Sequence, residues 1–316
     1  MTRFALVTVV ALLLTTSAAP AWNKAGHMAV SAIAYEVLRE EAPAAFARTL
    51  SLLKSHPSYD KLWKAELATV DAKDRDLYLF MLAGKWADEI RQNKDFDRPQ
   101  WHYVNYPFKP DGQPASVTTV PPEPENNLPN AYEFNLTRLK TAPDAVEKSV
   151  AVTWLFHLVG DVHQPLHTST LFTTEWPKGD RGGTRFYVKP TADAKTKNLH
   201  AVWDDLLLDS EKFDEVKKVA EELRGRKEFA KAELKEVGTL KFETWVKDES
   251  LPLAIKVGYR DGKLPGSNAE FTAPVLPDDY LKEAKPVADR RAVLAGYRLA
   301  GVLKSVLDQK FVIVEH

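Results

Sequence analysis

The chain has 316 residues, 44% hydrophobic and 28% charged, with eight histidines and no cysteine. These fractions exclude disordered, collagenous and multi-span membrane proteins, and the formal net charge of -1 excludes the strong basic bias that favours duplex DNA. Because cysteine is absent, disulfides, thiolate metal sites and cysteine nucleophiles are excluded, and nitrogen and oxygen must bind any metal.

The N-terminal segment has the features of a secretory signal peptide. A basic residue precedes the apolar run 5–14, and residues 19–21 (Ala-Pro-Ala) form a cleavage site of the small-x-small type. No other segment approaches twenty apolar residues, so we predict no membrane anchor in the mature protein. We predict that residues 1–21 are removed by cleavage between Ala21 and Trp22, leaving a periplasmic or secreted protein. The alternative is an uncleaved membrane anchor.

Most of the mature chain is predicted to be helical. Apolar residues at helical spacing predict helices over 28–38 and 42–53, and the strongest pattern covers 144–163. The segment 210–249 is rich in Lys and Glu at spacings typical of exposed helices, and a last helix is predicted over 286–307.

Three segments bearing proline or glycine interrupt the predicted helices. Residues 106–130 contain seven prolines, 168–184 end in Gly-Gly before the strand-like stretch 185–188, and 257–280 again carry both residue types. There is no internal repeat and no long linker. We therefore predict one mainly α domain over 22–316, with a short β-hairpin and long loops bearing Pro and Gly.

Histidine and aspartate recur in two pairs at helical spacing. His157 and Asp161 lie four residues apart in FHLVGDVHQPLH, and His200 and Asp204 repeat this spacing in NLHAVWDD. The apolar stripe beneath the first pair consists of Val146, Val150 and Trp154. This face is therefore predicted to point into the protein. A buried ion pair there would be costly, whereas imidazole and carboxylate together neutralise a metal dication.

Further candidate ligands stand in short separate motifs. They are Asp88 in GKWADEIR, His102 in WHYVNYP, His167 after Pro165, and His27 five residues after the predicted terminal Trp22. A single histidine on an apolar face is more often a hydrogen-bonded core residue, and we assign such structural or surface roles to His56, His163 and His316. The two spaced pairs together favour zinc in a hydrolytic site with open coordination positions.

These motifs resemble the zinc-dependent single-strand nucleases of the fungal P1 and S1 type, in the phospholipase C/P1 nuclease superfamily, and the chain looks like a bacterial member. The matching fragments are WNKAGH, WADEIR, WHYVN, HLVGDVHQPLH, Gly-Gly, NLHAVWD and AGYRLAGVL. They extend from Trp22 to about Leu307, so the resemblance covers the whole mature chain. It implies the helical fold of this superfamily and a cluster of three Zn²⁺ ions.

The resemblance assigns each candidate ligand to one zinc ion. The first ion would be bound by Asp88, His102, His157 and Asp161. The second would be bound by the α-amine and carbonyl of Trp22, by His27 and by a bridging Asp161. The third would be bound by His167, His200 and Asp204. Arg91 matches an arginine that contacts the substrate phosphate, and Tyr103 matches an aromatic residue that stacks on the nucleobase.

The implied function is hydrolysis of single-stranded DNA and RNA to 5′-nucleotides, with 3′-nucleotidase activity and a metal-bound hydroxide as nucleophile. A monomer without a protein partner is expected. One alternative is a zinc-dependent phospholipase C, although those enzymes resemble a pattern ending in H-x-x-x-E where this chain has Asp204. The other is a secreted zinc-binding protein without catalytic activity.

Two positions depart from the family pattern. Asn105 stands where fungal and plant members carry an aspartate that helps orient the attacking water, and an amide cannot act as a base. Thr184 follows Gly-Gly where the family tends to have asparagine, and the preceding loop 168–181 is longer. We expect these departures to affect substrate preference. Phe172 and Trp176 in this loop would either add base stacking or pack inside the protein.

Overall fold

The computed structural model describes residues 22–308. The predicted signal peptide 1–21, its cleavage bond and His316 therefore lie outside the described residues. Within 22–308, no helix combines the length and the apolar character that a bilayer crossing requires.

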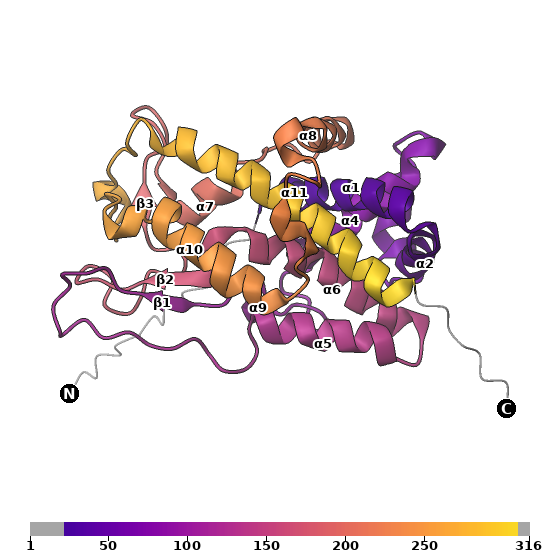
Figure 1. Cartoon of the computed structure of the whole chain (residues 1–316), viewed down its shortest axis with the longest axis horizontal. Coiled ribbons are helices and arrows are strands. Elements are labelled where there is room, and N and C mark those ends of the chain that lie inside the picture. The colour runs from indigo at the N-terminus through magenta and orange to yellow at the C-terminus, as the bar shows by residue number, and fades with distance from the viewer. Residues whose placement is uncertain (1–21, 309–316) are drawn as a thin grey trace, which may run out of the picture.

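The described chain is mainly helical, as predicted (Figure 1), and its buried apolar residues form a large core and a smaller second one. The helices are α1 (Lys24–Glu41), α2 (Pro43–Lys54), α3 (Lys64–Leu67), α4 (Arg75–Glu89), α5 (Leu128–Thr141), α6 (Ala145–His163), α7 (Leu199–Asp204), α8 (Phe213–Gly225), α9 (Phe242–Thr244), α10 (Leu251–Leu253) and α11 (Tyr280–Leu307). Short 3-10 turns at Pro99–His102 and Pro165–Thr168 join the longer elements.

Helix α1 is central to the packing, because it lies against both α4 and α11. Glycine permits both crossings. A Cβ at Gly84 of α4 would lie 2.1 Å from Ser31 Oγ of α1, and a Cβ at Gly296 of α11 would lie 2.5 Å from Ile33 Cγ2. Helix α6 packs against α4, α5 and α11 and is buried along most of its length. The helices α1, α4, α6 and α11 thus pack together in the interior of the protein. The first three of them carry candidate ligands.

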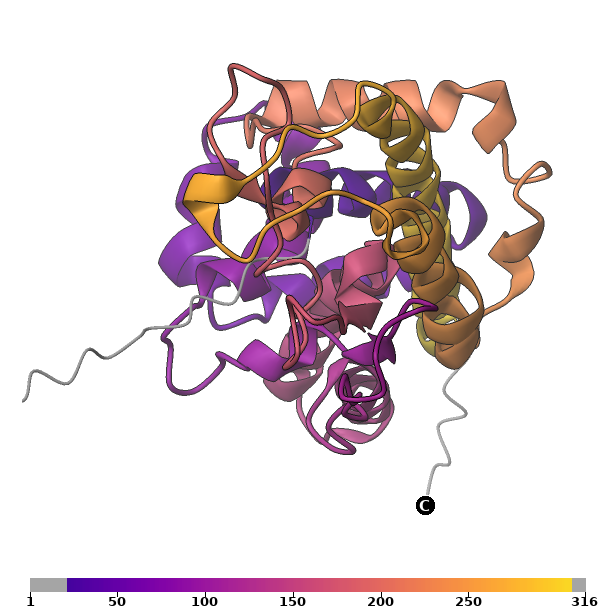
Figure 2. The ribbon, with the colours of Figure 1, turned by 90° about the vertical axis from the view of Figure 1, so that its left-hand side faces the viewer.

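The strands gather with α7 at one end of the molecule, which faces the viewer in Figure 2. Strand β1 (Tyr106–Phe108) pairs in parallel with β2 (Ser169–Leu171), and β3 (Tyr187–Val188) pairs antiparallel with β4 (Lys197–Asn198). The second pair is the predicted hairpin. The first pair was not predicted, because it joins two segments that the sequence indicates only as loops.

Several helix boundaries differ from the prediction for identifiable reasons. Helix α5 begins inside the proline-rich segment, because Pro129 occupies the first turn, where a missing N–H costs nothing. Helix α11 begins at Tyr280 and includes Pro286, which forgoes one backbone hydrogen bond. In 210–249 the only long helix is α8. Val146 is 48% exposed, so the buried face of α6 begins after it and the predicted stripe is too long by one residue.

Candidate metal centre

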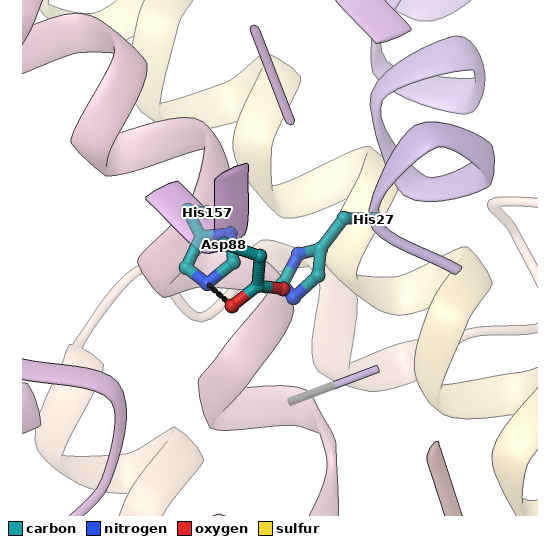
Figure 3. A group of neighbouring side chains, drawn as sticks. All are labelled: His27, Asp88 and His157. Atoms are coloured by element: carbon teal, nitrogen blue, oxygen red, sulfur yellow. Dashed lines mark ion pairs between the residues drawn. The ribbon is translucent and has the colours of Figure 1, made fainter. Parts of the chain in front are cut away.

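The structure brings together all eight histidine and aspartate side chains that the sequence singles out as ligands. They come from α1, α4, α6, α7 and the two 3-10 turns, and every one of them is buried. Their ligand atoms form three groups in which all atoms lie within 4.8 Å of one another. The groups are His27 with Asp88 and His157, His102 with His157 and Asp161, and His167 with His200 and Asp204. Figure 3 shows the first group, whose side chains converge from three separate helices.

The Asp161 carboxylate lies between the first two groups. Its Oδ1 is 3.1 Å from His27 Nε2 and 3.3 Å from His157 Nε2, and its Oδ2 is 3.2 Å from His102 Nδ1. Neither oxygen has a hydrogen-bond partner, although both are buried. A carboxylate in this position can bridge two cations with one oxygen each.

Hydrogen bonds to the backbone fix which nitrogen of several rings is available. The Nδ1–H of His157 donates to the Gly84 carbonyl at 2.9 Å, and that of His200 donates to the Gly182 carbonyl at 2.5 Å. His167 donates its Nδ1–H to the His102 carbonyl. The Nε2 atom of each ring then carries a lone pair. Metal-bound histidines show the same arrangement, because a carbonyl that accepts from one ring nitrogen leaves the other nitrogen to bind the metal.

The Nε2 lone pairs of His167 and His200 face one another, and two nitrogen atoms also approach closely in the second group. His167 Nε2 lies 2.9 Å from His200 Nε2, and His157 Nε2 lies 2.9 Å from His102 Nδ1. Two nitrogen ligands of a tetrahedral zinc ion are separated by about 3.3 Å, given Zn–N bonds of about 2.0–2.1 Å. Facing lone pairs repel unless a cation lies between them, so the donor geometry fits a bound metal ion.

Burial sets the charge of these groups in the protein without metal. Desolvation lowers the pKa of His27, His102 and His167 well below 6.5 and that of His157 to about 3. The same cause raises the pKa of Asp88 to about 7 and those of Asp161 and Asp204 well above 3.8. The histidines are thus neutral, as metal ligation requires. A bound divalent cation would favour the ionised form of the three carboxylates.

The close packing of His27 depends on a glycine in α6. The ring of His27 stacks on His157 at a centroid distance of 3.8 Å, and a Cβ at Gly160 would lie 2.5 Å from His27 Nδ1. The roles of Gly160, Gly84 and Gly182 were not predicted from the sequence. Only the Gly-Gly pair gave a signal that could have found one of them.

The start of α1 lies beside the third group. The backbone N–H of Asn23 donates to the Asp204 carbonyl at 3.3 Å, and the Asn23 amide donates to Asp205 Oδ1 and the Leu208 carbonyl. The neighbouring Trp22 is fully buried. These contacts hold the Trp22 backbone, for which the sequence predicts a ligand role, next to α7.

The remaining predicted site residues surround the three groups. Arg91 Nη2 donates to Asp88 Oδ1 at 3.0 Å, while its Nη1 is buried without a hydrogen-bond partner. Tyr103 and Asn105 are half-buried and flank the buried Val104, whose N–H donates to the His167 carbonyl. In this extended backbone, residues two apart share a face, so Tyr103 and Asn105 lie on the face opposite Val104.

The loop aromatics Phe172 and Trp176 are packing residues. They are 2% and 8% exposed, and Trp176 stacks on Phe186 at a centroid distance of 4.6 Å. The Trp176 indole N–H also donates to the Arg185 carbonyl. Of the two roles that the sequence leaves open for this pair, the structure favours packing. His163 is likewise structural, as predicted, because its Nε2 accepts from Arg298.

A buried aspartate holds the loop that carries Gly182. Asp180 is 0% exposed, and its carboxylate accepts from the Leu171 N–H at 2.8 Å and the Tyr259 hydroxyl at 2.8 Å. These contacts join the loop to β2 and to the segment after α10. Gly182, two residues after Asp180, provides the carbonyl that accepts from His200 Nδ1. Desolvation raises the pKa of Asp180 to about 6.

The Asp180→Asn variant is expected to weaken the pH dependence of stability. Since the folded-state pKa of Asp180 is raised from 3.8 to about 6, its protonated form stabilises the fold fully below pH 3.8. That contribution, about 3 kcal/mol by linkage, is lost as the pH rises through 6. We expect the difference in unfolding free energy between pH 4 and pH 7 to shrink by this order in the variant, with chelator present in both proteins. Identical pH profiles would contradict the assignment.

The chain is similar to known proteins over its full described length. A family model for S1/P1 nuclease matches residues 22–308. Endonuclease 3 of Arabidopsis thaliana is 25% identical over 98% of this chain and 96% of its own, and Endonuclease 4 of the same plant is 26% identical over 92% and 90%. Nuclease S1 of Aspergillus oryzae is 36% identical over 66 residues, which cover 21% of this chain and 20% of that protein.

Proposed function

Because the chain belongs to the S1/P1 nuclease family, we propose that it is a zinc-dependent nuclease with three Zn²⁺ ions that hydrolyses single-stranded DNA and RNA. The family is metal-dependent, and because the chain is a member of it, the protein is a nuclease that acts on nucleic acids. We propose further that the products are 5′-nucleotides and that the protein has 3′-nucleotidase activity.

The observation that carries this proposal is the pair of facing Nε2 atoms in the third group. His167 and His200 donate their Nδ1–H groups to carbonyls, and their Nε2 atoms approach to 2.9 Å. The unpartnered oxygens of Asp161 lie beside the other histidines, and Asp88, whose Oδ2 is also unpartnered, has its Oδ1 3.8 Å from His157 Nε2. We propose that one ion is held by Asp88, His102, His157 and Asp161, a second by Trp22, His27 and Asp161, and a third by His167, His200 and Asp204.

Zinc ions bound there would act as Lewis acids toward the phosphate and lower the pKa of a bound water. The chain's own contribution is positioning and charge. Arg91 carries a guanidinium beside Asp88, and its Nη1 lies 3.9 Å from Asp97 Oδ1 without a hydrogen-bond partner, so we assign this N–H group to a phosphate oxygen of the substrate. Asn105 can accept a hydrogen bond from water but cannot remove a proton.

The preference for single strands follows from the surface beside the site. Tyr103 lies before β1 and is half-buried on the side of the chain opposite Val104, where its ring can stack on an unpaired base. A paired base in a duplex offers no free face for such stacking. The net charge of -1 also gives duplex DNA little non-specific attraction.

We also propose that the protein acts outside the cytoplasm, as a monomer. The signal-peptide pattern supports export, and the family model begins at Trp22, the residue that follows the proposed cleavage bond. Cleavage there would create the α-amine that we assign to the second zinc ion. A residue left before Trp22 would move that amine.

The test combines zinc quantification with a substrate panel. We expect the purified mature protein to contain three zinc ions and to cleave single-stranded DNA, RNA and nucleoside 3′-monophosphates. A chelator should abolish cleavage and lower the midpoint of thermal unfolding, because bound zinc stabilises only the folded chain. Release of phosphocholine from phosphatidylcholine without cleavage of nucleic acid would favour a phospholipase C. Bound zinc without hydrolysis of any phosphoester would favour a non-catalytic zinc-binding protein.

A further inference from the structure

The segment 176–190 carries an excess of unpaired positive charge. Its cations are Lys178, Arg181, Arg185 and Lys189, and its one acidic residue, Asp180, is buried. Lys178, Arg181 and Arg185 are exposed, and no side chain in the described chain forms an ion pair with them. By contrast, the segment around α8 has paired surface cations, as in the Lys217–Asp74 and Lys212–Glu215 contacts.

Arg181 has an unfavourable backbone conformation for a residue with a side chain. Its φ is +57°, in the left-handed region, and Gly182 and Gly183 follow with φ of +62° and +84°. Glycine adopts this conformation without strain, whereas a residue with a Cβ does not. The surrounding contacts impose the conformation, because the Arg181 N–H donates to Thr170 Oγ1 at 3.1 Å and Asp180 is anchored from two sides. A strained position that carries arginine where glycine would fit points to a role for the side chain.

The position of Arg181 relative to the metal centre defines that role. The next residue, Gly182, accepts the hydrogen bond of His200 Nδ1, and this nitrogen lies on the side of the ring opposite Nε2. Arg181 therefore stands one residue from the carbonyl that orients a candidate ligand, and its exposed side chain is not one of the ligands. We assign the phosphate at the metal centre to Arg91, which leaves Arg181 for a neighbouring phosphate of a polymer.

We propose that Arg181 binds the backbone phosphate adjacent to the scissile one in a single-stranded polynucleotide, with Lys178 and Arg185 extending the path of the strand. This inference rests on the proposed nuclease function and concerns the substrate of the same site. Guanidinium groups bind phosphate oxygens in a bidentate manner, and an unpaired, exposed arginine is available to do so. The segment thus makes the enzyme favour polymers over mononucleotides.

The test compares the zinc-loaded wild-type protein with the Arg181→Gly variant on two substrates. For a single-stranded oligonucleotide at low salt, we expect KM to rise about 5–10-fold in the variant. The dependence of log KM on log salt should become shallower by about 0.7, the value for one lost contact to a single strand. For a nucleoside 3′-monophosphate, which has no adjacent phosphate, kcat and KM should not change.

Stability measurements on Arg181→Gly and one control variant separate substrate binding from structure. Arg181→Gly should keep its zinc content and the same or a higher unfolding midpoint, because glycine relieves the left-handed strain. Arg75→Ala is the matched control, since Arg75 is exposed, has no ion pair among the described residues and begins α4 at the end opposite Asp88. It should change neither KM nor the salt dependence.

The outcomes distinguish this inference from the function on which it rests. An unchanged oligonucleotide KM in Arg181→Gly would overturn the inference while the nuclease function stood. An equal loss on the oligonucleotide and the mononucleotide would also overturn it, because Arg181 would then act at the scissile phosphate or on the zinc centre. A zinc-loaded wild-type protein that cleaves no phosphodiester would instead refute the proposed function.

Discussion

The Asp161→Asn variant is expected to lose two of the three zinc ions that we propose for this protein and about 10³-fold or more of its nuclease activity. The carboxylate of Asp161 lies within 3.1–3.3 Å of nitrogen atoms of three histidines. Asparagine has nearly the same shape but carries no charge and offers only one oxygen. It therefore cannot bridge two cations. Two ions should be lost together because each depends on the same carboxylate.

The matched variant is Asp204→Asn, which changes a carboxylate that belongs to one group only. We expect it to lose a single zinc ion, the one assigned to His167 and His200. Elemental analysis of both purified variants, after removal of weakly bound metal, measures the difference directly. Equal zinc losses in the two variants, or full zinc content in Asp161→Asn, would contradict the bridging role.

The Glu249→Ala variant is expected to lower the free energy of unfolding by about 3–5 kcal/mol, which is the usual cost of leaving buried charges unpaired. Glu249 Oε2 accepts from Arg291 Nη1 at 2.5 Å and from Arg298 Nη1 at 2.7 Å, and its Oε1 accepts from Arg298 Nη2 at 2.6 Å. Both arginines are buried, with exposures of 2% and 0%. The alanine variant would leave two guanidinium groups without a counterion.

The pKa shifts in this cluster agree with its geometry. Hydrogen bonds and charge from Arg298 and Arg291 outweigh burial and hold the pKa of Glu249 below 4.5, while burial lowers the pKa of Arg291 to about 10. The cluster also reaches α6, since Arg298 donates to His163 Nε2 and Arg291 donates to the His163 carbonyl. Glu249 thus holds α11 against the helix that carries His157 and Asp161.

Denaturant unfolding at saturating zinc would measure the effect. Glu249→Gln should fall between wild type and alanine, because it keeps the shape and one acceptor but not the charge. Glu243→Ala is the control on the same stretch of chain, since Glu243 pairs only with the exposed Lys247. It should be indistinguishable from wild type. A Glu249→Ala variant as stable as the control would contradict the assigned role.

The sequence predicted the chemistry of the site better than its surroundings. Spacing of four residues on a helix places His157 with Asp161 and His200 with Asp204, and the structure does bring each pair together. That relation is local, since it follows from the helical repeat alone. The predicted helix over 144–163 is confirmed for the same reason, and Asp144 caps its N-terminus by accepting a hydrogen bond from the Glu147 N–H.

The surroundings depend on contacts between distant residues. Nothing near His157 in the sequence indicates that its Nδ1–H meets the Gly84 carbonyl, 73 residues away. The parallel pairing of β1 with β2 and the Glu249 cluster are equally non-local. A local pattern can also have two meanings, because proline is typical both of loops and of the first turn of a helix. Pro129 lies in the first turn of α5, within a segment predicted to be irregular.

By itself, the sequence determined which atoms are available for chemistry. With no cysteine and two spaced pairs of histidine and aspartate, a metal site in this chain must use nitrogen and oxygen, and the helical repeat fixes the pairs. Only the tertiary structure decided how these atoms face one another. Carbonyls from distant segments orient the rings, and Asp161 reaches three histidines, because the packing of α1, α4 and α6 brings their faces together.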